Sequence, residues 1–148
     1  MNPSFIVLAT ALIACATGYE VRLHATRIEQ VDPTLAAQLG DIARAKGLVA
    51  RMVEHRNINA PDFSLTSHYS KELSPKPHDA IRMDVIYSDE RSASQSIHVF
   101  IENRVSGMEP PVKREIDALG DACYDLLARA VGRDKVSVEK GPVPYGPW

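Results

Sequence analysis

Four stretches of this chain alternate between apolar and polar side chains, and this period of two limits what the chain can fold into. The first runs from Tyr19 to Ala25, and the others cover residues 63–73, 81–88 and 97–102. A strand with this pattern buries one face and leaves the other in water. The last three stretches follow one another through short polar links, as in an antiparallel meander. We therefore expect a sheet that is covered on one face only.

Two segments with helical periodicity can supply that cover. Asp32-Pro33 is typical of a helix start, and apolar residues then recur at helical spacing to about His55. A second helix is expected to begin after Glu109-Pro110-Pro111 and to end at Gly132. Its apolar stripe includes Cys123, which we expect to be a buried thiol.

A short edge strand at residues 135–139, with Val136 and Val138 inward, would complete the element order β-α-β-β-β-α-β. This order predicts an α+β fold, a two-layer sandwich in which an antiparallel sheet of four to five strands carries two helices on one face. Residues 19–140 would form this single domain, and residues 141–148 a tail rich in proline and glycine.

The first fifteen residues follow a different pattern. From Phe5 to Ala14 the chain carries no charge, and this run is shorter than the roughly 20 residues of a membrane-spanning helix. It is typical of the apolar part of a secretory signal. The sequence Leu12-Ile13-Ala14-Cys15 resembles the lipobox of bacterial lipoproteins. The resemblance implies that residues 1–14 are removed and that Cys15 becomes the acylated first residue, with residues 15–18 as anchor and short linker.

The lipoprotein resemblance also implies a location and a partner. In that family alanine after the cysteine implies release to the outer membrane, so Ala16 favours an outer-membrane protein that faces the periplasm. The start Cys15-Ala16-Thr17-Gly18-Tyr19 is loosely similar, over these five residues, to that of the lipopolysaccharide-assembly lipoproteins. Small lipoproteins with a sheet backed by two helices include assembly factors, secretion accessories and immunity proteins, which implies a partner in the cell envelope.

Two other interpretations of the apolar run stay open. Ordinary signal cleavage after Ala16 would release a secreted protein without lipid, and the run could instead be a buried strand or helix. Cys15 and Cys123 are the two cysteines of the chain. If Cys15 carries no lipid, a disulfide between them is feasible in an oxidising compartment.

Composition and motifs exclude several function classes. The formal net charge of −2 argues against a nucleic-acid partner. The chain has no Gly-x-Ser-x-Gly elbow, Walker loop, Gly-x-Gly-x-x-Gly, His-Glu-x-x-His or Cys-x-x-Cys motif. We therefore expect a protein that is not an enzyme and has no cofactor.

The outward face of the sheet carries the candidate site. Its predicted members are Glu20, Arg22, His24, Thr26, Ser64, Thr66, His68, Arg82, Asp84, His98, Phe100 and Glu102. Three of them, His24, His68 and His98, could bind a metal ion or a small molecule if strand order brings them together. The alternative is a solvated face on which Arg–carboxylate pairs link neighbouring strands.

Two large apolar residues on this face, Ile86 and Phe100, could contact each other across strands or form a patch that a partner covers. Tyr145 and Trp148 in the tail could bind in a partner's groove, or the tail could be mobile or fold back on its own domain. The leading hypothesis is a non-catalytic, membrane-anchored module that binds another envelope component. The alternatives are a metal or small-molecule binder and, last, a hydrolase. A sheet with an open face and a free edge can also form a homodimer.

Overall fold

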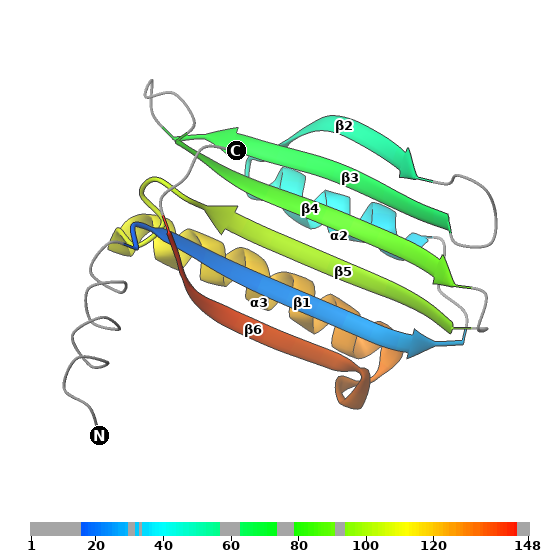
Figure 1. Ribbon diagram of the computed structural model, residues 1–148. Helices are drawn as coiled ribbons and strands as arrows, with labels where there is room; N and C mark the ends of the chain where they lie inside the picture. Colours follow the sequence, from blue (N-terminus) through cyan, green and yellow to red (C-terminus); the bar gives the residue numbers. More distant parts are fainter. Residues whose placement is uncertain are drawn as a thin grey trace, which may run out of the picture.

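The computed structural model describes residues 16–29, 32, 34–56, 63–73, 79–90 and 94–144. It confirms an α+β fold in which both helices lie on one face of an antiparallel sheet, behind the strands as drawn in Figure 1. The sheet has six strands, more than the four to five expected, in the order β2-β3-β4-β5-β1-β6. In chain order the elements are β1 (Gly18–Ile28), α2 (Thr34–Ala45), β2 (Val49–Arg56), β3 (Phe63–Glu72), β4 (Ala80–Glu90), β5 (Ser94–Asn103), α3 (Pro110–Val131), a short 3-10 helix (Arg133–Lys135) and β6 (Val136–Val143).

The extra strand comes from the segment predicted to continue the first helix to His55, and that prediction is wrong. Helix α2 ends at Ala45 because Gly47 adopts a left-handed backbone with φ of 85°. The backbone N–H of Leu48 donates to the carbonyl of Ala43 at 3.0 Å, and that of Gly47 donates to Arg44 at 2.9 Å. This pair of bonds is the Schellman motif that closes many helices. The chain then turns back as β2, at the edge of the sheet.

The core lies between the helices and the inward face of the sheet. Strand register brings apolar residues together, with Val21 opposite Ile101 and Leu23 opposite Val99. Cys123 is buried on the inner face of α3, as predicted. Other residues of this core are Ala25, Met83, Val85 and Ile97 from the sheet, Leu35, Leu39 and Ala43 from α2, and Ile116, Leu119 and Leu127 from α3.

The expected start of α2 and both expected ends of α3 are confirmed. Asp32 accepts hydrogen bonds from the backbone N–H and the hydroxyl of Thr34, both at 2.8 Å, at the start of α2. Glu109 precedes the proline that opens α3, and Gly132 closes that helix. In the part of the chain that the structure describes, neither helix is long and apolar enough to cross a membrane.

Strand β6 reaches further than predicted, since it includes residues 141–143 of the segment assigned to the tail. Pro142 is tolerated there because β6 is an edge strand that pairs only with β1, the position in a sheet where proline is normally found. Val136 packs against the core as expected. Val138 also points inward as expected, since it lies opposite the buried Leu23, but at this edge of the sheet it stays 40% exposed.

A buried polar network organises the loop between β5 and α3. The Asn103 amide donates to Asp79 Oδ1 at 3.0 Å, and its carbonyl oxygen accepts from the backbone N–H groups of Val105 and Ser106 at 2.9 and 2.8 Å. The Ser106 hydroxyl also donates to Asp79 Oδ1, at 2.7 Å. One asparagine therefore ties this loop to the segment that precedes β4.

Candidate binding surface

The face of the sheet opposite the helices is not covered by any described part of the chain (Figure 1). Because side chains alternate along a strand, the inward positions of β1, β4 and β5 place their neighbours on this open face. The structure confirms the predicted sides, with core residues Val21, Val85 and Val99 buried, Ile86 and Phe100 partly buried, and Arg22 exposed.

The centre of the open face is a cluster of three rings from two adjacent strands. His24 on β1 lies directly opposite His98 on β5, and their Nδ1 atoms are 2.6 Å apart. The ring centroid of Phe100 is 5.8 Å from that of His24 and 6.4 Å from that of His98. The Arg22 guanidinium carbon lies 5.8 Å from the Phe100 centroid, in cation–π range.

The contact between His24 and His98 constrains their protonation. In an N–H···N hydrogen bond one imidazole donates and the other must offer a lone pair. Two fully protonated rings have only donors, so they cannot make this contact. The pair can therefore carry at most one positive charge in this geometry.

Ile86 lies opposite His98 on one side and Thr66 on the other, whereas Phe100 lies opposite Asp84 and Arg22. The two large apolar residues are therefore not a directly facing cross-strand pair. They are diagonal neighbours on adjacent strands, and both stay partly exposed. This arrangement fits a patch better than a self-contained contact.

Charged side chains border the rings where β1 begins and β5 ends. Glu20 and Glu102 face each other across these strands, an unfavourable pairing of like charges. Each pairs with the arginine two residues further along the chain, Glu20 with Arg22 and Glu102 with Arg104, both at 3.0 Å. Burial raises the pKa of Glu102, although the hydrogen bond from Arg104 acts against this. Burial also lowers the pKa of Arg82 on β4.

His68 does not join the other two histidines, contrary to the arrangement that a three-histidine site needs. It lies on β3, where its Nδ1 is 2.7 Å from Asp84 Oδ1 and its Nε2 is 3.7 Å from Glu54 Oε2. Its Nε2 is buried without a hydrogen-bond partner among the described residues. Within the described ranges, no group of three or more His, Cys, Asp or Glu side chains is placed to hold a metal ion.

Apolar side chains are also exposed on both faces of the edge strand β2. Val49 and Met52 lie on the open face, opposite Ser70 and His68, whereas Val53 lies on the other face, opposite Ser67. Val49, Met52 and Val53 are 56%, 54% and 55% exposed. These exposed residues were not predicted from the sequence, because their spacing matches the apolar stripe of a helix. The signal that could have found them is Gly47 followed by residues with high strand propensity.

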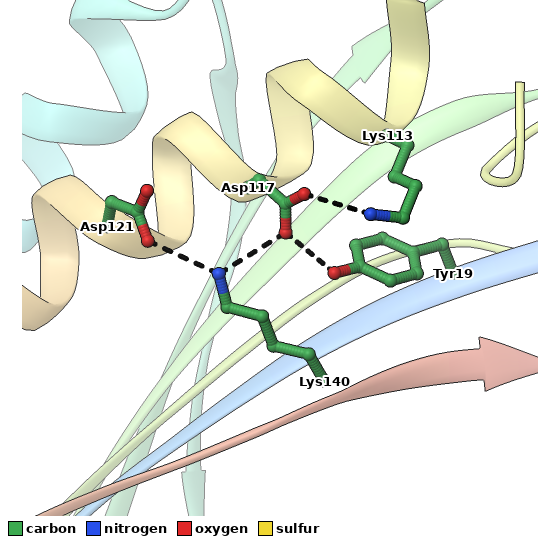
Figure 2. Close-up of polar contacts among 5 residues, drawn as sticks. All are labelled: Tyr19, Lys113, Asp117, Asp121 and Lys140. Atoms are coloured by element: carbon green, nitrogen blue, oxygen red, sulfur yellow. Dashed lines mark hydrogen bonds and ion pairs between the residues drawn. The ribbon is translucent and has the colours of Figure 1, made fainter. Parts of the chain in front are cut away.

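A separate polar cluster connects α3 to β1 and β6, as Figure 2 shows. The Tyr19 hydroxyl donates to Asp117 at 2.6 Å, and burial, together with that carboxylate, raises the tyrosine pKa. Lys113 and Lys140 also donate to Asp117, and Lys140 reaches Asp121 at 3.3 Å. Burial acts to raise the Asp117 pKa, but these hydrogen bonds lower it on balance. The donors to Asp117 and Asp121 are side chains of this domain itself, so we assign the cluster a structural role: it holds α3 against β1 and β6.

Several predicted site residues fall outside the residues that the structure describes, namely Cys15, Tyr145 and Trp148. Cys123 is fully buried, and burial raises the pKa of its thiol to about 12, which makes it a poor nucleophile. No protein-family model matches the chain, and no curated protein matches it either.

Proposed function

We propose that this protein is a lipid-anchored, non-catalytic component of the bacterial envelope that binds another envelope protein through the open face of its sheet. The observation that carries the proposal is the face itself. Two helices cover one side of the sheet, while His24, His98 and Phe100 cluster on the other side beside Ile86. The lipobox-like sequence that ends at Cys15 supports the anchor.

The chemistry of this face suits protein recognition. Aromatic residues and arginine dominate the energetic centres of interfaces, and a polar rim commonly surrounds them. Here the guanidinium carbon of Arg22 lies 5.8 Å from the centroid of the Phe100 ring. The ion pair between Glu102 and Arg104 lies beside this ring. The partner that fits is a surface with an apolar centre and acceptors for the arginines.

Charge substitution in the patch tests this proposal. We expect Phe100→Asp, and Ile86→Lys separately, to reduce capture of the partner at least about tenfold, because each places a charge in an apolar contact. Both side chains are only partly buried, so the melting temperature should fall by no more than a few degrees. The measurement is affinity capture from gently solubilised envelopes with quantitative mass spectrometry.

A matched control is Val138→Asp, on the edge strand β6 at 40% exposure. It should leave capture unchanged. Unaffected capture by both patch variants would move the interface elsewhere. Capture that is lost with Met52→Lys instead would place it on the β2 edge.

The second candidate function is metal or small-molecule binding by His24 and His98, which face each other across β1 and β5. A metal ion would have to replace the hydrogen bond between their Nδ1 atoms. The docking proposal predicts that Zn²⁺ or Cu²⁺ leaves the melting temperature unchanged. A ligand at a hundred times its Kd would instead add about 2.7 kcal/mol of stability. A rise that His24→Gln abolishes and His68→Gln retains would support the metal site over docking.

A further inference from the structure

The chain just after Cys15 is fastened to the folded domain. The Thr17 hydroxyl donates to the carbonyl of Arg104 at 3.0 Å, and the backbone N–H of Met108 donates to the carbonyl of Thr17 at 3.0 Å. Two residues of extended chain span at most about 7 Å. A lipid on Cys15 would therefore hold the loop of residues 104–109 next to the membrane rather than on a flexible tether.

That loop presents an apolar side chain at the same end of the sheet. Met108 is 42% exposed. The loop backbone is pressed against the start of β1, since a Cβ added to Gly107 would lie 2.4 Å from the Tyr19 nitrogen. Met108 therefore lies on a closely packed loop and is hydrogen-bonded to Thr17, two residues after Cys15.

The start of α3 adds a backbone with few unsatisfied donors. The first four N–H groups of a helix lack partners within the helix, and leaving such groups without water is costly near lipid. Pro110 and Pro111 occupy the first two positions of α3 and have no N–H to satisfy. Both are exposed. This helix end is therefore easier to place against a bilayer than an ordinary one.

We infer that the loop of residues 104–109 and the first turn of α3 form a second contact with the phospholipid surface, with Met108 inserted at the level of the headgroups. The inference rests on the proposed acylation of Cys15. The contact is apolar in character, because Arg104 and Lys113 already pair with Glu102 and Asp117 and Glu109 is acidic. It should therefore persist at high salt, unlike a contact through basic residues.

The orientation of the domain follows from this contact. The start of β1 and the end of β5 lie beside this loop, and the other strands are aligned with these two. The strands therefore extend away from the end of the sheet that carries Met108. The open face would then stand upright from the membrane and meet its partner from the side.

A pair of fluorescent labels tests the contact. The full chain, produced in a bacterial envelope, is reconstituted into phosphatidylethanolamine–phosphatidylglycerol vesicles with an NBD label on Met108→Cys or on Val138→Cys. The two positions have similar exposure, 42% and 40%, but Val138 lies towards the opposite end of β6. The native Cys123 is fully buried and should escape labelling.

We expect a blue shift at position 108 and quenching by lipids that carry a spin label about 5–10 Å deep, with neither effect at position 138. Both effects should survive high salt. If the protein floats with the vesicles but the label at position 108 stays in water, the second contact is overturned and the anchor is not. Equal quenching at positions 108 and 138 would overturn the second contact as well. A protein that fails to float with vesicles would overturn the proposed anchor, and the second contact with it.

Discussion

Replacing Asn103 with leucine is expected to lower the free energy of unfolding by about 3 kcal/mol, the largest effect of a single polar substitution that we anticipate in this domain. Asn103 is fully buried. Its amide donates to Asp79, and its carbonyl oxygen accepts from two backbone N–H groups. Leucine has the same branching at Cγ but is larger, and it leaves those two donors and the Asp79 carboxylate without this partner.

Urea denaturation of the wild-type protein and of the Asn103→Leu variant measures this difference. Ser106→Ala is the graded control, because it removes only one hydrogen bond to Asp79 and should destabilise by about 1 kcal/mol. An Asn103→Leu protein within about 1 kcal/mol of wild type would mean that the network does not hold the loop.

The second large effect concerns the proposed anchor. Cys15→Ser should abolish incorporation of labelled fatty acid and move the protein from the membrane to the soluble fraction. One acyl chain binds a membrane only marginally, whereas several chains on one residue anchor it firmly, so the change should be nearly complete. Metabolic labelling followed by fractionation measures both consequences.

Cys123→Ala is the matched control for this experiment, since that thiol is fully buried and should contribute no label. Acyl labelling that persists unchanged in Cys15→Ser would remove the lipoprotein proposal. Label lost in Cys123→Ala instead would contradict the burial of that residue.

The alternation of side chains was enough to predict most of the sheet, because one buried face leaves a clear period of two. The prediction failed at residues 49–56. Val49, Met52 and Val53 have spacings of three and four and so match a helix, although they are exposed on an edge strand. The decisive signal was Gly47, whose left-handed backbone ends α2.

The open face was predictable as a set of residues, but its contacts were not. Which histidines meet depends on β1 lying next to β5, a pairing between segments about 70 residues apart. The same order leaves His68 with Asp84. The hydrogen bond from Tyr19 to Asp117 also depends on tertiary packing, and no local sequence pattern predicts it.

The most direct test of the account is site-specific photo-crosslinking in living cells, with a photoreactive phenylalanine at position 100 or at position 125. Phe100 lies on the open face, whereas Asp125 is exposed on α3, on the opposite layer of the sandwich. We predict one dominant adduct with an envelope protein at position 100 and none at position 125. An adduct at position 125 with none at position 100 would contradict the claim that the open sheet face is the binding surface.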